Sequence, residues 1–435
     1  MKQFSESIVN HPSYLETEAI LSNSFDLVCL SHLRWDFVYQ RPQHLLSRCV
    51  KNRRVFFVEE PVVESIDSWW LEVSQRECGL WVVVPHLPNW VSDGLVTIMH
   101  QSLMDELFEK YAIVSPILWY YTPTALSFTH HLPSSVIVYD CMDELSAFRG
   151  ASPALQELER QLLQRADVVF TGGQSLYEAK QHLHSNIHAF PSSIDAAHFH
   201  QARTHAEEPP DQRDIPHPRL GFYGVIDERM DLDLLDNIAQ AKPNWHLVII
   251  GPVVKIDPDR LPHYPNVHYL GSKSYQELPN YLAGWDVAIL PFACNESTRF
   301  ISPTKTPEYL AAGKPVVSTS IRDVVRPYGQ QNLVQIADTA ADFIAAAERA
   351  MQQRQEADWC DRVDRFLAQN SWDQTWAKMI QLIASARASR SATHLTDQSA
   401  AKADRSTGST QRPPKATIRQ FSRVPARSDN QSLKR

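Results

Sequence analysis

The amino-acid sequence predicts an α/β protein built from two facing Rossmann-like, doubly wound domains. Short apolar segments alternate with amphipathic helical segments, which is the pattern of parallel sheets covered by helices on both faces. The alternation runs in two series, and a polar segment at residues 201–218 separates them as a linker. In such folds ligands bind at the carboxyl ends of the strands, so two facing sheets predict a shared cleft.

The first series predicts one Rossmann-like domain at residues 25–200. We expect its strands, in chain order, at residues 26–31, 54–58, 80–84, 116–121, 136–140, 168–171 and 187–191. Helices are expected between them, including residues 41–50 and 154–165. Residues 1–24 precede this series as an N-terminal extension. They contain no apolar stretch preceded by positively charged residues, so we expect no signal peptide.

The second series predicts another Rossmann-like domain at residues 219–370. Its expected strands lie at residues 220–225, 246–250, 267–270, 287–290 and 315–319, and its expected helices at 231–241, 275–284, 303–312 and 340–353. A last helix at about residues 371–386 is expected to pack back on the first domain.

The charge of the chain is divided between an acidic body and a basic tail. Residues 387–435 carry 11 Lys/Arg and 3 Asp/Glu, hence +8, whereas the whole chain has a net charge of −8. The tail has few large apolar residues, so we predict that it is disordered. Its positive charge leaves open a peripheral contact with an anionic membrane. The acidic body argues against nucleic acid as a partner.

Composition predicts a cytoplasmic protein. The 435 residues, 43% of them hydrophobic, suffice for two cores, and no run reaches the roughly 18 apolar residues of a membrane span. The six cysteines lie far apart in sequence and lack the close pairs of zinc or redox motifs. We therefore expect a location in the cytoplasm, with attachment to the inner face of the membrane left open.

One segment, SPTKTPEYLAAGKPVVST at residues 302–319, predicts a short helix that leads into a buried strand. Ser302 can cap the helix, Pro303 can occupy its first turn, and Gly313 can end it. The apolar pair Val316 and Val317 then begins the strand.

The same segment combines a cation with a carboxylate at a helix start. Backbone N–H groups around Pro303, Thr304 and Lys305 attract phosphate, and Lys305 adds a point charge for a pyrophosphate. Glu308, one turn on, can accept hydrogen bonds from both hydroxyls of a ribose. A Lys or Glu on an exposed helix face is otherwise simply solvated, which is the structural alternative.

Several motifs follow one another in a fixed order: ADVVFT at residues 166–171, FPSSID at 190–195, GFYG at 221–224, IIG at 249–251 and EYLAAG at 308–313. With them, roughly residues 25–385 resemble the two-domain B-fold (GT-B) glycosyltransferases, and more narrowly the retaining family 4, or glycosyl transferases group 1, type. The segment WDFVYQRPQH at residues 35–44 resembles a subgroup found with bacterial cell-surface polysaccharide genes.

The resemblance implies a nucleotide-sugar donor bound by the domain at residues 219–370 and a glycan or lipid-linked acceptor on the side of the domain at residues 25–200. It also implies a set of site residues. Arg229 and Lys305 would stabilise the departing diphosphate, and Glu308 would bind the ribose. Gly224, within GFYG, would lie against the donor. The alternative for Arg229 is an ion pair with Asp231 or Asp233.

The first domain supplies weaker candidates at the ends of its strands. His32 and Asp143 could hydrogen-bond the transferred sugar or the acceptor, Arg41 could hold an anionic group of the acceptor, and Asp36 is a candidate cleft wall. Each is equally well explained as a helix cap or a turn residue.

The chain also departs from the family pattern. The family carries two glutamates separated by seven residues, but the position eight before Glu308 is Phe300. No G-x-G-x-x-G loop occurs, which argues against a nicotinamide or flavin dehydrogenase.

No cofactor or metal is expected. The D-x-D pairs at residues 231–233 and 257–259 resemble metal-binding pairs, but the first opens a predicted helix and the second lies in a Pro-rich loop.

Two other functions remain open from the sequence. A nucleotide-sugar epimerase can share the fold, although no acid and base cluster for two sugar faces is evident. A catalytically silent sugar-nucleotide-binding protein would fit the missing glutamate.

Overall fold

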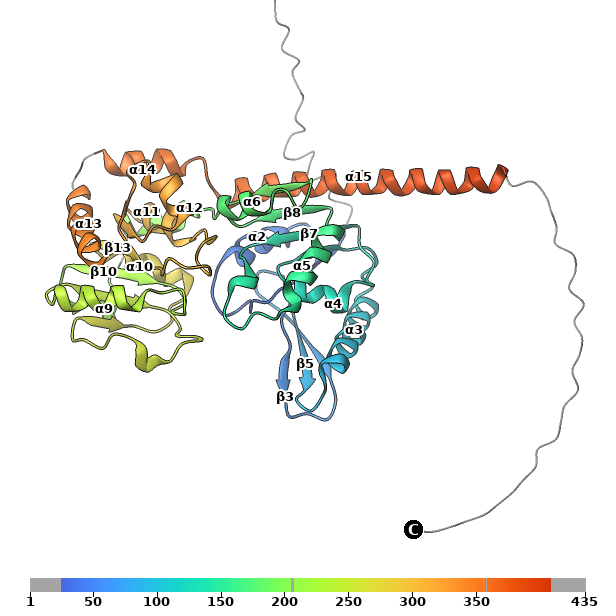
Figure 1. The fold of residues 1–435 in the computed structure, drawn as a ribbon, viewed down its shortest axis with the longest axis horizontal. Coiled ribbons are helices and arrows are strands. Elements are labelled where there is room, and N and C mark those ends of the chain that lie inside the picture. The colour runs from blue at the N-terminus through green and yellow to red at the C-terminus, as the bar shows by residue number, and fades with distance from the viewer. Residues whose placement is uncertain (1–24, 205–206, 355, 357, 408–435) are drawn as a thin grey trace, which may run out of the picture. The chain divides into compact units, whose positions relative to one another are not determined.

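The computed structural model describes residues 25–204, 207–354, 356 and 358–407 (Figure 1). Within them, the first half contains a nine-stranded sheet with the order β3-β5-β2-β1-β6-β7-β8-β9, and β4 pairs with β5. Only the pairing of β4 with β5 is antiparallel among the strand pairs described. The strands are β1 Leu27–Leu30, β2 Val55–Val58, β3 Val62–Glu64, β4 Trp70–Gln75, β5 Trp81–Pro88, β6 Ile117–Tyr120, β7 Val136–Cys141, β8 Val168–Thr171 and β9 Ile187–Ala189.

Helices cover both faces of this sheet because its strands alternate their apolar side chains between two cores. Val28 and Leu30 of β1 pack into a core with α3, α4, α5 and α6, whereas Leu27 and Cys29 pack into a second core with α2 and the beginning of α15. The helices are α2 Arg41–Cys49, α3 Asp93–Lys110, α4 Leu126–Thr129, α5 Ala154–Arg165, α6 Gln174–Lys180 and α15 Trp372–Thr407.

The second half has a parallel sheet of six described strands in the order β12-β11-β10-β13-β14-β15. This is the doubly wound order, in which the chain starts at the centre and reverses direction between β10 and β13. The strands are β10 Arg219–Tyr223, β11 His246–Ile250, β12 Val267–Tyr269, β13 Val287–Leu290, β14 Val316–Ser318 and β15 Val334–Ile336. Helices of this half include α7 Ala196–Thr204, α8 Pro210–Arg213, α9 Leu232–Ala241, α10 Leu278–Ala283, α11 Lys305–Ala311, α13 Ala340–Gln353 and α14 Trp359–Leu367 (Figure 1).

The predicted fold class is confirmed, and the differences lie in individual elements. The edge strands β3, β4 and β15 and the helices α3, α7 and α14 belong to the structure but not to the prediction. The segment expected to be a linker holds the end of α7 and all of α8. The predicted N-terminal extension, residues 1–24, lies outside the described residues.

The predicted disordered tail begins at residue 387, and α15 continues past this position to Thr407. The first residues of the predicted tail also make contacts. Arg390 forms an ion pair with Asp167 at 2.6 Å, and the Arg387 guanidinium lies 3.7 Å from the centre of the Phe25 ring. Residues 408–435, the rest of the predicted tail, lie outside the described residues.

Candidate active site

A cavity of about 430 Å³ lies at the carboxyl ends of both sheets. The first half contributes the loop after β1 and the ends of β7 and β8, and the second half contributes the loops after β10, β11 and β12 and the start of α11. Its lining includes residues 35–41, 142–143, 223–225, 250–252, 272–276 and 301–305, together with Arg229 and Glu308. The shared cleft expected from two facing doubly wound sheets is therefore present.

Helix α11 begins later than predicted. It starts at Lys305, and neither Ser302 nor Thr304 caps it through a side chain. Instead, the carbonyl oxygen of Ser302 accepts a hydrogen bond from the Ser192 hydroxyl at 2.8 Å. Pro303 thus precedes the helix rather than occupying its first turn, although Ser302, Pro303 and Thr304 all line the cavity. The predicted end is correct: Gly313 follows the helix with a φ of +71°, a conformation that favours glycine.

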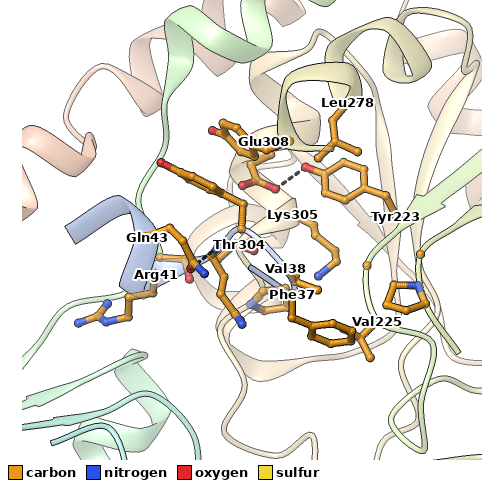
Figure 2. Close-up of a pocket in the computed structure, with 18 of the residues that line it drawn as sticks. Phe37, Val38, Arg41, Gln43, Tyr223, Val225, Leu278, Thr304, Lys305 and Glu308 are labelled. Carbon is orange, nitrogen blue, oxygen red and sulfur yellow. Dashed lines mark hydrogen bonds between the residues drawn. The ribbon is translucent and has the colours of Figure 1, made fainter. Parts of the chain in front are cut away.

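Glu308 lies one turn into α11 and is buried, with 5% of its surface exposed. The hydroxyl of Tyr223, at the end of β10, donates a hydrogen bond to Glu308 Oε2 (Figure 2). Burial raises the pKa of Glu308 to about 7, and the Tyr223 hydrogen bond and the Lys305 charge oppose the rise. The carboxylate is therefore fixed in direction, and it changes charge near neutral pH.

Lys305 is half-buried, and its side chain crosses directly over Gly224. A Cβ atom at Gly224 would lie 2.2 Å from Lys305 Cε and 2.7 Å from Nζ, and Gly224 has a φ of +142°. Only glycine therefore leaves room for the lysine at this turn. Burial lowers the pKa of Lys305, Glu308 opposes the shift, and the Arg229 charge lowers the pKa further. Among the described residues, Lys305 Nζ has no hydrogen-bond or ion-pair partner.

Arg229, the second predicted cation, also lines the cavity. Its ion-pair partner is Asp227, not Asp231 or Asp233. Its guanidinium binds Asp227, with Nη2 2.7 Å from Oδ2 and Nε 3.0 Å from Oδ1, and it lies 5.7 Å from the centre of the Phe148 ring. Asp231 instead caps α9 by accepting the N–H of Leu234. Arg229 is thus half-neutralised, which leaves Lys305 as the less compensated of the two cations.

Two of the first-half candidates are already paired within the chain. The guanidinium of Arg41 forms hydrogen bonds to both carboxylate oxygens of Asp140 and to the Phe190 carbonyl. In Figure 2 it points away from Lys305 and Glu308. Arg41 was expected to bind an anionic group of the acceptor, but in the structure it binds the carboxylate of Asp140 instead. Asp36 is exposed at the cavity rim and pairs with Arg76 at 2.6 Å.

Asp143 and His32 differ in their access to the cavity. Asp143 lines it, and its charge acts on Lys305, Arg229 and His32. His32 is not among the lining residues described, and its Nδ1 is buried without a partner in the described part of the chain. Burial lowers the pKa of His32, while Asp143 opposes the shift. Asp143 is consequently the better placed of the two to meet a substrate.

Phe300, which stands where the family has its first glutamate, packs against the core of the first half. The guanidinium of Arg299 lies 5.2 Å from the centre of its ring. This position therefore contributes an apolar contact between the two halves and no carboxylate.

The described residues contain no group of three or more His, Cys, Asp or Glu side chains arranged to hold a metal ion. Their helices also include none that is long and apolar enough to cross a membrane.

Some lining residues escaped the sequence analysis. Tyr223, which bonds Glu308, was named only as part of the GFYG motif. Its position at a strand end, immediately before Gly224, is a sequence signal that could have identified it. Tyr39 and Tyr275 also line the cavity. Tyr39 lies in the WDFVYQRPQH segment, which gave it no individual role, and the sequence around Tyr275 gave no signal.

Two doubly wound domains that share a cleft are the architecture of the GT-B fold. A lysine, an arginine and a buried glutamate line this cleft. Residues 217–353 match the family model described as glycosyl transferases group 1. The chain therefore has the GT-B fold, and its second half is similar to this family.

The chain is also similar to particular proteins. A Bacillus subtilis (strain 168) protein named as a teichuronic acid biosynthesis glycosyltransferase, TuaH, is 27% identical over 259 residues, which cover 54% of this chain and 64% of that protein. The match thus spans less than two thirds of the relative. The sucrose-phosphate synthase of Thermosynechococcus elongatus aligns with a TM-score of 0.58 at 14% identity, covering 82% of this chain and 98% of the other.

A second solved structure is similar to the same extent. The UDP-forming α,α-trehalose-phosphate synthase of Burkholderia xenovorans, in complex with glucose-6-phosphate, aligns with a TM-score of 0.61 at 11% identity and covers 82% of this chain and 99% of the other. At these identities the two synthases show the shared fold.

Proposed function

We propose that the protein moves a sugar, with retention, from a nucleoside diphosphate donor to a glycan or lipid-linked acceptor during cell-surface polysaccharide synthesis. The observation that carries the proposal is Lys305. Its ammonium group has no hydrogen-bond or ion-pair partner among the described residues and lies 5.9 Å from the centre of the Phe222 ring. It faces a cavity in which Glu308, one helical turn away, is positioned to accept hydrogen bonds. Such a pair is complementary to the two ends of a nucleoside diphosphate. The name of the teichuronic acid relative supports the polysaccharide context.

The proposed reaction requires charge stabilisation and orientation from the protein. The bond between the anomeric carbon and the β-phosphate oxygen breaks, and negative charge develops on the diphosphate beside Lys305 and Arg229. The departing phosphate oxygen takes the proton of the acceptor hydroxyl on the same face of the sugar, and that hydroxyl oxygen forms the new glycosidic bond. Glu308 holds the ribose, so that the phosphates reach the cations in a fixed position. Asp143, from the first half of the chain, lines the same cavity and is the proposed contact to the acceptor.

A donor panel tests this proposal. Purified protein is incubated with UDP-, GDP-, ADP- and dTDP-sugars, and free nucleoside diphosphate is measured beside Lys305→Met and Glu308→Ala. We expect slow hydrolysis of one donor, and its loss in both variants. A panel in which no donor is turned over or bound would contradict the proposal.

One observation favours a second candidate, a catalytically silent sugar-nucleotide-binding protein. Phe300 supplies no carboxylate where the family has one. For a silent protein, a donor would raise the melting temperature in the same wells, while no nucleoside diphosphate would appear even with a mixture of glycan acceptors.

Donor binding should weaken on both sides of neutral pH. Because burial raises the pKa of Glu308 to about 7, the carboxylate is lost as the pH falls through that value, and affinity should then drop by up to about 10-fold per pH unit. Because burial lowers the pKa of Lys305, its charge is lost at a lower pH than that of an ordinary lysine. Titration calorimetry with the intact nucleotide sugar, whose phosphates do not titrate in this range, measures both limbs. In Glu308→Gln only the alkaline limb should remain, and an unchanged acid limb would refute the assignment.

A further inference from the structure

Tyr275 lines the cavity and carries a hydroxyl that no other described residue satisfies. Its ring lies at the beginning of the turn before α10 and lines the cavity. The hydroxyl oxygen is buried and has no hydrogen-bond partner in the part of the chain that the structure describes. A buried hydroxyl normally has a partner, so an unpaired one at a binding cavity indicates a group supplied by a ligand.

The ring of Tyr275 is fixed on both faces. It stacks on Tyr39 with ring centres 4.3 Å apart and on His198 with ring centres 4.2 Å apart. His44 and Phe199 meet it edge-on at 5.5 and 5.6 Å. The backbone carbonyl of Tyr275 also bonds to His198 Nε2 at 2.9 Å. The direction of the hydroxyl is therefore set before any ligand arrives, which reduces the entropy lost on binding.

The hydroxyl is also close to the residue assigned to the ribose. Burial raises the pKa of the Tyr275 phenol, and the charge of Glu308 is the next largest cause, so the two groups lie near each other. Tyr223 already occupies Glu308 Oε2. A ribose hydroxyl bound to the other carboxylate oxygen, Oε1, would thus come within reach of the Tyr275 phenol.

We propose that Tyr275 is a specificity residue for the nucleoside of the donor, and that its hydroxyl hydrogen-bonds one of the two ribose hydroxyls beside Glu308. This inference rests on the proposed function, because it assumes that a nucleoside diphosphate occupies the cavity. It extends that function by making the protein selective for a ribonucleotide over the deoxyribonucleotide that lacks the contacted hydroxyl. The protein would discriminate against the deoxynucleotide because binding it leaves the buried Tyr275 hydroxyl without a hydrogen-bond partner.

The test compares nucleotides that differ by one hydroxyl. Calorimetry first ranks UDP, GDP and ADP, and the tightest is then compared with its 2′-deoxy and 3′-deoxy forms on wild-type protein and Tyr275→Phe. We expect Tyr275→Phe to weaken the ribonucleotide by about 10-fold, and to leave the affinity for one of the two deoxy forms unchanged. Phenylalanine keeps the ring and its stacking, so the fold should be preserved. Tyr269→Phe, which removes a phenol bonded to the Pro262 carbonyl at 3.2 Å, is the matched control and should alter no affinity.

The outcomes separate the two proposals. If Tyr275→Phe weakened the binding of the ribonucleotide and of both deoxy forms equally, the ribose contact would be overturned and the proposed function would stand. The same holds if Tyr275→Phe did not weaken the binding of the ribonucleotide. Binding of dTDP by the wild-type protein, with no binding of UDP, GDP or ADP, would overturn this inference alone. Absence of binding to all four nucleotides would overturn the proposed function and this inference together.

Discussion

Replacing Lys305 with methionine should lower kcat/KM for donor turnover by about 100- to 1,000-fold, the usual effect of removing one group that stabilises developing negative charge. Methionine keeps much of the length that crosses Gly224 and removes only the charge. Arg229 cannot compensate fully, because Asp227 already neutralises part of its charge. Most of the loss should appear in kcat, since the charge on the leaving diphosphate grows in the transition state. Steady-state kinetics with the donor found in the panel measures it.

The same substitution should not destabilise the protein. Lys305 is half-buried and, among the described residues, has no hydrogen bond to lose, and burial already disfavours its charged form. The melting temperature should therefore stay constant or rise. Lys242→Met is the control, because Lys242 is a lysine paired with Glu348 away from the cavity, and its activity should match that of the wild type. Near-normal turnover in Lys305→Met would remove Lys305 from the proposed mechanism.

The fold was predictable where one periodicity dominated a segment. Residues 154–165 and 340–353 were expected as helices, and α5 and α13 have those bounds. In α3 the apolar residues do not form a single stripe, because Leu95 and Ile98 are exposed while Met99 and Leu103 are buried. The helical period is hidden in such a pattern. The strands β3 and β4 lie at the sheet edge, where exposed positions such as Val63 and Trp70 dilute the strand signal.

The candidate site was predictable where neighbours in sequence are neighbours in space. Lys305 and Glu308 are one helical turn apart, so their spacing alone placed them together. The pair of Arg41 and Asp140 joins residues 99 positions apart, and no local pattern indicates it. The late start of α11 has a similar origin, because the hydroxyl that bonds the Ser302 carbonyl belongs to Ser192 in the other half.

Replacing Asp140 with alanine should lower the free energy of unfolding by about 3–5 kcal/mol, because it leaves a buried charge without its partner. Arg41 and Asp140 are 4% and 0% exposed, and the guanidinium makes three bonds of 2.9–3.2 Å to the carboxylate. Its remaining bond, from Nη1 to the Phe190 carbonyl at 2.8 Å, cannot neutralise the charge. Chemical denaturation followed by tryptophan fluorescence measures the loss.

The double variant Arg41→Met, Asp140→Ala distinguishes a structural pair from an acceptor site. With both charges gone, no unpaired ion remains in the core, so the double variant should be more stable than Asp140→Ala alone. This follows if Arg41 serves to join α2 to β7 and to the segment after β9, as its hydrogen bonds indicate. If Arg41→Met alone kept the stability of the wild type and raised KM for the acceptor only, Arg41 would instead hold the acceptor, and Asp140 would serve to orient it.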